Sequence, residues 1–222
     1  MKIKVLKNVF QRNDNAAREN RELLDARGVT CVNLLGGAGA GKTSLLEAVI
    51  PVLRDSLRMG VLEGDLATTK DATRVDALGV PVIQLLTDGG CHLTATLVQQ
   101  GLRRLPLDGL DMLLIENVGN PICPAGFDLG EHLRISVLSV TEGDDKAAKY
   151  PLLFKDADLI VLSKCDLQPL TDFDFNTVTR DLRRINRRAE ILQTQARRAI
   201  GTEALATWLL DRCRPSSAAS RE

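Results

Sequence analysis

The sequence is poor in the features that mark nucleic-acid-binding and membrane proteins. Its 29 Lys and Arg residues balance 29 Asp and Glu residues, so no net field favours a polyanion or a membrane surface. Aromatic residues make up only 3% of the 222 residues, too few for a surface that stacks bases. No apolar run approaches the roughly 20 residues of a membrane span. We therefore expect no nucleic-acid partner and no membrane insertion.

The chain also lacks the marks of a secreted protein. Its start, Met-Lys-Ile-Lys, has neither the apolar core nor the cleavage site of a signal peptide. Its cysteines are odd in number and widely spaced, unlike a disulfide framework. They are Cys31, Cys91, Cys123, Cys165 and Cys213. We therefore expect a cytoplasmic protein, with one domain over residues 1–213 and a disordered polar tail over 214–222.

Short apolar segments alternate with helical periodicity along the chain. We predict strands at residues 29–35, 59–62, 80–86, 112–115, 135–140, 159–162 and 191–192. We predict helices at 43–57, where Pro51 permits a kink or a break, and at 92–102, 173–186 and 202–212. A polar leading helix over 12–27 ends at Gly28. This alternation predicts an α/β fold of three layers, with a mostly parallel sheet covered on both faces and an added N-terminal helix.

A glycine-rich loop between the first predicted strand and helix fits a phosphate site. The segment Gly36-Gly37-Ala38-Gly39-Ala40-Gly41-Lys42-Thr43-Ser44 contains the GxxxxGK[ST] pattern of P-loop NTPases. Its backbone N–H groups and the following helix N-terminus would hold phosphate oxygens. Lys42 would reach the β- and γ-phosphates, and the Thr43 hydroxyl would bind Mg²⁺. A glycine-rich turn that matches by chance is the alternative, which the flanking elements disfavour.

Two carboxylates follow apolar strands at the same predicted edge of the sheet. Asp65 and Glu116 could each hold Mg²⁺, directly or through water, or orient the attacking water. With Lys42 they form the predicted catalytic set. Either acid taken alone could instead cap a helix or lie in solvent. The P-loop favours the metal role, because phosphoryl transfer needs a metal ligand at that edge.

The segment after the sixth predicted strand resembles a guanine-recognition loop. Ser163-Lys164-Cys165-Asp166 stands where GTPases commonly carry Asn-Lys-x-Asp. Asp166 offers acceptors to the N1–H and 2-amino groups of guanine, and the Lys164 stem would pack on the ring. Ser163 departs from the pattern, and its shorter side chain should make fewer bonds to the P-loop. We expect guanine selectivity to survive with weaker affinity.

Two cysteines and a histidine could meet beside the nucleotide. Cys91 and His92 are adjacent after one strand, and Cys123 lies seven residues after Glu116, in a loop that Pro121 and Pro124 restrict. Two thiolates and an imidazole suit Ni²⁺ or Zn²⁺. For the adjacent pair alone, a buried thiol and a capping histidine is the more common arrangement. We interpret Cys31 and Cys213 as structural, and His132 as a surface or capping residue.

These motifs together resemble the HypB family. GGAGAGKTSLLE, LEGD, GGCHL, ENVGNPICPAGFDLGE, SVTEGDDKAAKYP and SKCDL follow the order and spacing of that family from about residue 12 to 212. The resemblance implies a Rossmann-like P-loop fold and a GTPase that inserts nickel into [NiFe] hydrogenase. It implies slow GTP hydrolysis to GDP, a GTP-dependent homodimer, and Ni²⁺ or Zn²⁺ at Cys91, His92 and Cys123. It also implies two partners, the metallochaperone HypA and the hydrogenase large subunit.

The chain departs from the family pattern at its start and near its end, and other functions fit some of the same motifs. The chain has no Cys-rich or His-rich start, which disfavours nickel storage, and Gln193 to Gly201 lacks a clear guanine loop. The main alternative is a GTPase that serves another metal or cobalamin enzyme, such as urease. A P-loop kinase is disfavoured by Lys164 and Asp166. A metal-binding dimer with a decayed GTPase is disfavoured by the intact Lys42, Thr43 and Asp65.

Overall fold

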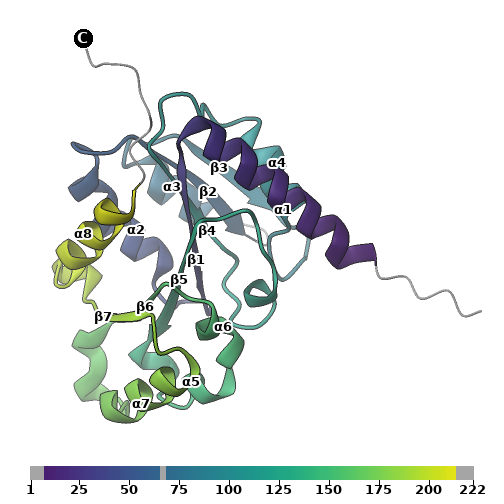
Figure 1. The fold of residues 1–222 in the computed structure, drawn as a ribbon. Coiled ribbons are helices and arrows are strands. Elements are labelled where there is room, and N and C mark those ends of the chain that lie inside the picture. Colours follow the sequence, from purple (N-terminus) through teal and green to yellow (C-terminus); the bar gives the residue numbers. More distant parts are fainter. Residues whose placement is uncertain (1–7, 66–68, 214–222) are drawn as a thin grey trace, which may run out of the picture.

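A seven-stranded sheet, parallel in every described ladder, forms the centre of the molecule (Figure 1). The computed structural model describes residues 8–65 and 69–213. The strand order is β3-β2-β4-β1-β5-β6-β7. The strands are β1 (Thr30–Gly36), β2 (Met59–Asp65), β3 (Val82–Leu86), β4 (Met112–Glu116), β5 (Leu133–Ser139), β6 (Leu159–Ser163) and β7 (Glu190–Gln193). The predicted α/β fold with a parallel sheet is confirmed.

Helices cover both faces of the sheet and make the three predicted layers. On one face lie α2 (Lys42–Leu53), α3 (Lys70–Asp76) and α8 (Thr202–Arg212). On the other lie α1 (Asn8–Arg27), α4 (Ala95–Leu102), α5 (Lys146–Lys149), α6 (Pro151–Lys155) and α7 (Phe175–Ile185). Short 3₁₀ turns occur at η1 (Pro124–Gly126), η2 (Val140–Glu142), η3 (Cys165–Leu170) and η4 (Ala196–Arg198). Figure 1 shows α8 and α1 on opposite sides of the sheet.

Alternation along the strands explains why both faces are covered. In β1, Val32 and Leu34 belong to the cluster with α2 and α8, whereas Cys31 belongs to the cluster with α1 and α4. Successive strand residues point to opposite faces, so a strand that is apolar throughout requires cover on both sides. All seven residues of β1 are buried. The apolar runs in the sequence therefore specify a central parallel sheet.

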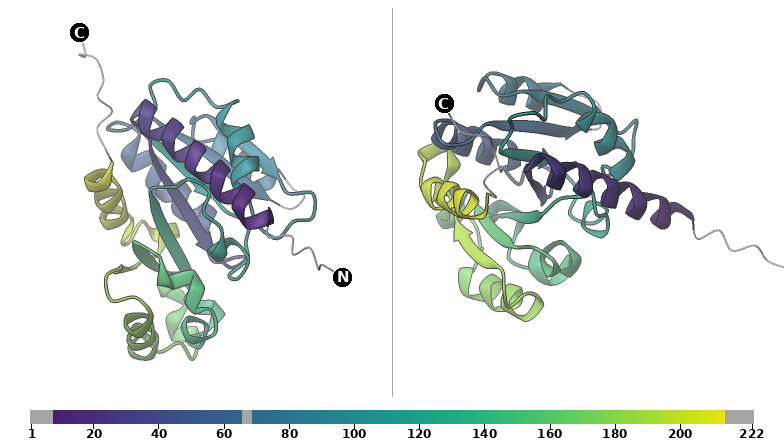
Figure 2. Two further views of the ribbon diagram at one scale, coloured as in Figure 1. Left: turned by 45° about the vertical axis from the view of Figure 1, so that its right-hand side comes forward. Right: turned by 45° about the horizontal axis from the view of Figure 1, so that its top comes forward.

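The leading helix is present and begins earlier than predicted, at Asn8 instead of residue 12. Gly28 ends it with a φ of 66°, as expected for a glycine after a helix. Figure 2 shows α1 lying along the outside of the sheet near α4. The Asn13 side chain accepts a 2.9 Å hydrogen bond from the backbone N–H of Ala95, the first residue of α4. Asn13 of helix α1 therefore gives a hydrogen-bond partner to a backbone N–H group at the N-terminus of α4. Helix α4 starts just after the Cys91–His92 pair.

Several predicted helix boundaries were wrong, and one helix beside the site was not predicted. Helix α4 begins at Ala95 and not at His92, because the Thr94 hydroxyl accepts a bond from Leu97 N–H and caps the helix. His92 therefore lies in a loop. Helix α3 was not predicted at all. Helix α2 contains Pro51 and ends at Leu53, four residues before the predicted end.

Two further predictions concern the C-terminal tail and the absence of a membrane-spanning helix. The predicted disordered tail at 214–222 lies outside the described residues. Within residues 8–65 and 69–213, no helix is long and apolar enough to cross a membrane.

Candidate functional site

The P-loop lies where strand β1 turns into helix α2 and bounds a pocket of about 750 Å³. Gly41 has a φ of 97°, in the left-handed region that favours glycine, and Lys42 is the first residue of α2. A Cβ atom at Gly37 would approach Glu142 Oε1 to 2.3 Å. The backbone at Gly41 therefore favours glycine, whereas a side chain at position 37 would require the Glu142 carboxylate to move.

The Lys42 ammonium group is buried inside this loop. The side chain of Lys42 reaches back so that Nζ donates to the carbonyl oxygens of Gly36 and Gly37, at 3.4 and 3.3 Å. Burial lowers its pKa, and the nearby Glu116 and Glu142 carboxylates oppose that shift. A buried ammonium group that contacts only carbonyl dipoles is well placed for an anion in the pocket.

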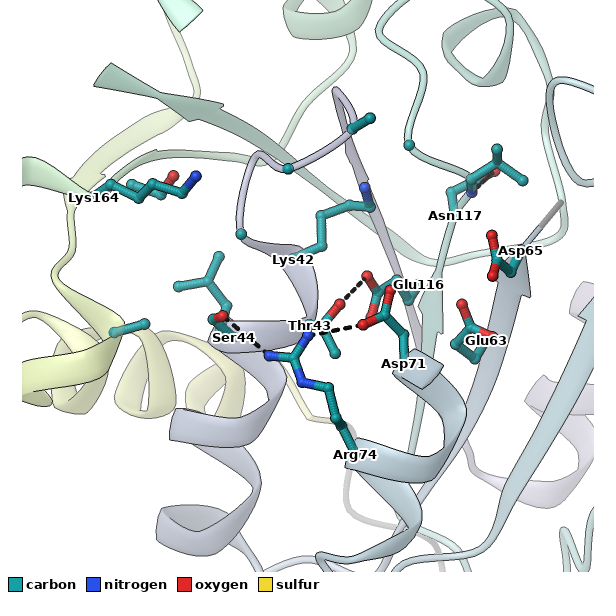
Figure 3. A pocket seen from close by; sticks show the side chains of 18 of the residues that line it. Lys42, Thr43, Ser44, Glu63, Asp65, Asp71, Arg74, Glu116, Asn117 and Lys164 are labelled. Atoms are coloured by element: carbon teal, nitrogen blue, oxygen red, sulfur yellow. Dashed lines mark hydrogen bonds and ion pairs between the residues drawn. The ribbon is translucent and has the colours of Figure 1, made fainter. Parts of the chain in front are cut away.

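Four carboxylates, those of Glu63, Asp65, Asp71 and Glu116, gather with the Thr43 hydroxyl beside the P-loop (Figure 3). Thr43 Oγ1 donates a 2.7 Å hydrogen bond to Glu116 Oε1. Burial raises the pKa of Glu116 to about 7 and that of Glu63 to about 8. Glu116 Oε2 and Glu63 Oε2 are buried without a hydrogen-bond partner among the described residues. Asp65 ends strand β2 at the same pocket.

This donor set fits a magnesium ion. Mg²⁺ prefers carboxylate and hydroxyl oxygens, and a cation here would satisfy the two orphaned oxygens. Of the predicted residues, Thr43, Asp65 and Glu116 line one pocket together with Lys42. Glu63 was missed, although it lies two residues before Asp65 and therefore on the same face of β2, which the sequence could have indicated.

Helix α3 contributes two further pocket residues that the sequence analysis missed. Arg74 bonds to Asp71 at 2.8 Å, to both Glu47 oxygens at 2.9 and 2.6 Å, and to Ser44 Oγ at 3.3 Å. Figure 3 shows Asp71 beside Thr43 and Glu116. Arg74 therefore connects α3 to the helix that follows the P-loop. No motif marks these positions, because their place depends on the path of the chain after β2.

The other end of the pocket holds the predicted base site. Lys164 has a φ of 56° and lines the pocket with Asp166. Ser163 Oγ donates a 2.5 Å hydrogen bond to the carbonyl oxygen of Ala40, so the base loop is bonded to the P-loop despite the shorter side chain. Ala196 and Arg197 of η4 line the pocket near this end. They lie in the segment whose guanine contact the sequence left unassigned.

The structure brings Cys91, His92 and Cys123 together. One potential ligand atom from each lies within 4.8 Å of the others. Cys91 Sγ is 3.5 Å from His92 Nδ1. A hydrogen bond with Cys123 raises the pKa of Cys91, and burial lowers the pKa of His92, which favours the neutral imidazole that binds metals. Cys91 is exposed and Cys123 is partly buried, so the cluster is accessible from solvent.

Turns present these ligands. The Thr87 hydroxyl donates to the Gly90 carbonyl at 2.6 Å, which closes the turn before Cys91. Asn120 Oδ1 accepts hydrogen bonds from Ile122 N–H at 2.8 Å and Cys123 N–H at 3.4 Å. Such turns form locally from Asn and Thr side chains, so the sequence itself shapes both loops.

The remaining cysteines and histidine take no part in this cluster. Cys31 is buried, and the thiols of Cys165 and Cys213 donate to the carbonyl oxygens of Leu162 and Asp111. The interpretation of His132 as a surface or capping residue was wrong. Its side chain is 7% exposed, and Nδ1 accepts a 2.8 Å bond from the Cys31 N–H.

Asn117 joins the two halves of the site. It lines the nucleotide pocket directly after Glu116 and is 1% exposed. Its Oδ1 accepts bonds from Val118 N–H at 2.9 Å and from Leu93 N–H at 3.4 Å. Its Nδ2 donates to Asn33 Oδ1 on β1 at 3.3 Å. One buried side chain therefore contacts the strand that enters the P-loop and the residue that follows His92.

Comparison with protein families gives the class of protein. The model of the CobW/HypB/UreG nucleotide-binding domain matches residues 30–193, which include the P-loop, the three-residue cluster and the base loop. The chain is a P-loop nucleotide-binding protein and belongs to the CobW/HypB/UreG family.

Individual relatives narrow the assignment to the HypB branch. The chain is 44% identical over 207 residues to the hydrogenase maturation factor HypB of Rhizobium leguminosarum bv. viciae, covering 93% of this chain and 69% of that protein. It is 40% identical over 184 residues to the hydrogenase/urease maturation factor HypB of Helicobacter hepaticus, covering 81% and 75%. The crystal structure of HypB from Helicobacter pylori in complex with nickel aligns with a TM-score of 0.87 at 33% identity, covering 95% of this chain and 99% of that one.

Proposed function

We propose that this protein is a Mg²⁺-dependent GTPase that carries nickel and delivers it during maturation of [NiFe] hydrogenase. One observation carries the proposal: a P-loop pocket and a cluster of two thiols and an imidazole share one edge of the sheet, and Asn117 both lines the pocket and bonds to Leu93, the residue that follows His92. Membership of the HypB branch and the nickel complex of the Helicobacter pylori relative support it.

In the proposed GTPase, each residue of the nucleotide pocket has a role. The P-loop amides, from Gly36 to Ser44, hold the phosphates, and Lys42 neutralises the β- and γ-phosphate charge. Thr43, Asp65 and Glu116 hold Mg²⁺, which supplies further neutralisation of charge on the transferring phosphoryl group. Asp65 or Glu116 orients the attacking water through its carboxylate. Asp166 accepts from the guanine N–H groups, and Lys164 packs on the ring.

The cluster of Cys91, His92 and Cys123 holds its metal ion as cargo to be delivered. Cys91, His92 and Cys123 supply soft and borderline ligands that suit Ni²⁺ or Zn²⁺. Three ligands leave a four-coordinate ion with one open position, unlike the closed sets of structural zinc sites. A thiolate from a second copy or from an acceptor protein would fill that position. Exchange of the fourth ligand is the simplest route by which such an ion is passed on.

The partners follow from this role. GTP brings two copies together as a homodimer, the metallochaperone HypA exchanges nickel with it, and the hydrogenase large subunit is the final acceptor. The protein works in the cytoplasm, where thiols such as the exposed Cys91 stay reduced. Neither nucleic acid nor membrane takes part.

A second candidate is a GTPase metallochaperone for another metal or cobalamin enzyme, such as urease. The Helicobacter hepaticus relative is named a hydrogenase/urease maturation factor, which favours urease among these alternatives. The P-loop and the cysteine cluster serve either acceptor. Nickel transfer to purified apo-hydrogenase and apo-urease distinguishes the two: transfer to urease alone would replace the leading proposal.

The test is nickel titration of the purified protein with GDP and with a non-hydrolysable GTP analogue. We expect a change in nickel affinity of roughly 5- to 150-fold between the two states, and by linkage an equal effect of nickel on nucleotide affinity. Asn117→Ala should reduce this ratio, whereas Asn15→Ala on the exposed side of α1 should not. Equal nickel affinity in both nucleotide states, with no GTP hydrolysis, would overturn the proposal.

A further inference from the structure

Three aromatic rings are stacked in a row that ends at a ligand of the cluster. Phe127 lies face to face with His92, with ring centroids 3.9 Å apart and planes inclined by 26°. Phe10, near the start of α1, stacks on Phe127 at 5.7 Å and 24°. The row therefore joins three segments that are far apart in the sequence: the N-terminal helix, the loop that carries Cys123, and the loop that carries His92.

Phe127 does not belong to the apolar core. It is absent from all four clusters of packed apolar side chains among the described residues, although its neighbours Ala125 and Leu129 belong to two of them. Phe10 is 63% exposed. Phe127 is only partly buried, so its ring stabilises the fold through burial less than a core ring does, and its contact with His92 is the distinctive feature of this position.

The backbone of Phe127 is fixed from two sides. Its N–H donates to the Pro124 carbonyl at 3.2 Å, which closes the η1 turn. Its carbonyl accepts a 3.0 Å bond from Arg134 Nη2 on β5, and Arg134 Nε donates to the buried Glu131 at 2.6 Å. The ring thus stands on a support that is anchored to the central sheet.

His92 has no comparable anchor on its own loop. It precedes the N-cap of α4 by two residues, and within the part of the chain that the structure describes its side chain stacks on the Phe127 ring and lies beside Cys91, with Sγ 3.5 Å from Nδ1. Tilting of the imidazole out of its present plane would move Nδ1 away from Cys91 Sγ. The stacked ring opposes that tilt, because the imidazole must stay nearly parallel to Phe127 to keep the contact.

We propose that Phe127 is a positioning residue of the metal site, whose ring holds the His92 imidazole beside Cys91 and Cys123, and that Phe10 extends this constraint to helix α1. The inference rests on the proposed metal site and adds a residue that touches no metal. Supporting groups around metal ligands commonly change metal affinity by about 10- to 100-fold when replaced. A preorganised imidazole costs less ordering entropy on binding than a free one.

The test compares Phe127→Leu, which keeps an apolar side chain without a ring, with Phe127→Tyr, which keeps the ring. Ni²⁺ affinity is measured by competition with a chromophoric chelator, in the wild-type and His92→Ala backgrounds. We expect Phe127→Leu to weaken Ni²⁺ binding by about 10-fold in the wild-type background, and Phe127→Tyr to restore it. In the His92→Ala background, Phe127→Leu should have no further effect. Phe175→Leu, in the separate Phe173–Phe175 pair, is the matched control.

Two results would overturn the inference. Unchanged Ni²⁺ affinity in Phe127→Leu would do so, and so would an equal loss in both backgrounds, because Phe127 would then act by general support of the loop. Failure of the metal site itself is recognised separately, by Cys91→Ala and Cys123→Ala proteins that bind Ni²⁺ as the wild type does. In that case the His92 Cε1–H signal of the metal-free protein decides whether the stack exists. A ring-current shift that disappears in Phe127→Leu supports the stack, and an unmoved signal refutes it.

Discussion

Ser163 Oγ donates a 2.5 Å hydrogen bond to the carbonyl oxygen of Ala40, and this bond ties the loop that we propose to recognise the base to the P-loop. Ser163 is 3% exposed, and Ala40 is fully buried. The two loops lie 123 residues apart in the sequence and close the same pocket. A nucleotide that binds there meets a phosphate end and a base end already held at a fixed separation, which reduces the ordering required on binding.

We predict that Ser163→Ala weakens GDP binding by roughly fivefold, because a typical buried hydrogen bond contributes about 1 kcal/mol and the Ala40 carbonyl would lose its partner. Calorimetric titration measures the change. Thr177→Ala, which removes an exposed hydroxyl bonded to Asp174, is the control and should bind GDP normally. A Ser163→Ala protein with wild-type affinity would mean that the tether does not organise the pocket.

Base selectivity depends on Asp166 in our assignment. We predict that the protein prefers GTP to ATP and that Asp166→Asn moves the preference toward xanthine nucleotides, because the carboxylate acceptors are replaced by an amide that also donates. Competition binding with GTP, ATP and XTP measures this. Equal competition by ATP in the wild type would show that the base site is assigned wrongly.

Hydrolysis should depend on Lys42. We predict that Lys42→Ala abolishes GTP turnover while the melting temperature stays near that of the wild type, because the ammonium group bonds only to two P-loop carbonyls and packs little apolar surface. Phosphate release and thermal unfolding are the two measurements. Normal turnover in this variant would remove Lys42 from the proposed mechanism.

The cysteines of the cluster should produce a spectroscopic signal with nickel. We predict a thiolate-to-nickel charge-transfer band in the near ultraviolet that Cys91→Ala and Cys123→Ala each erase. Cys213→Ala should keep the band, because that thiol lies elsewhere and donates to the Asp111 carbonyl. An unchanged band in both of the first two variants would count against the cluster as a metal site.

Acid should loosen the attachment of α1. Burial opposes ionisation of Asp128, but the 2.7 Å bond and the charge of Arg21, together with the hydrogen bonds from the Gly130 N–H and with Glu131, outweigh it and lower the pKa of Asp128 below its ordinary 3.8. A depressed carboxyl pKa contributes stability above the unfolded-state value and loses it as the pH falls toward the folded-state value. We therefore predict that the stability difference between wild type and Arg21→Gln is present at pH 6 and shrinks below about pH 4.

Urea unfolding across this pH range measures that difference. The two residues are each more than a third exposed, so the difference should be small and should decrease with salt. A difference that stays constant from pH 6 to pH 3 would show that Arg21 acts through its bond to the Glu131 carbonyl instead.

The sequence by itself determined the sheet and the chemistry of the two half-sites. A strand that is buried on both faces and a phosphate-binding loop each form from residues that are adjacent in the sequence. The apolar segments and the segment from Gly36 to Thr43 therefore predicted these local structures. The acids at the strand ends were found because parallel strands end at one edge. Glu63 could have been found in the same way, from its spacing to Asp65.

Only the tertiary structure decided which distant side chains meet. Several contacts join segments whose proximity a single sequence does not indicate. They are the Ser163–Ala40 bond, the position of α3 with Arg74, the Asn117–Leu93 bond and the stack of Phe127 on His92. The burial of His132 belongs to the same class, because its partner Cys31 lies 101 residues away. Local patterns follow from chain geometry, whereas these contacts depend on how the packed elements bring their loops together.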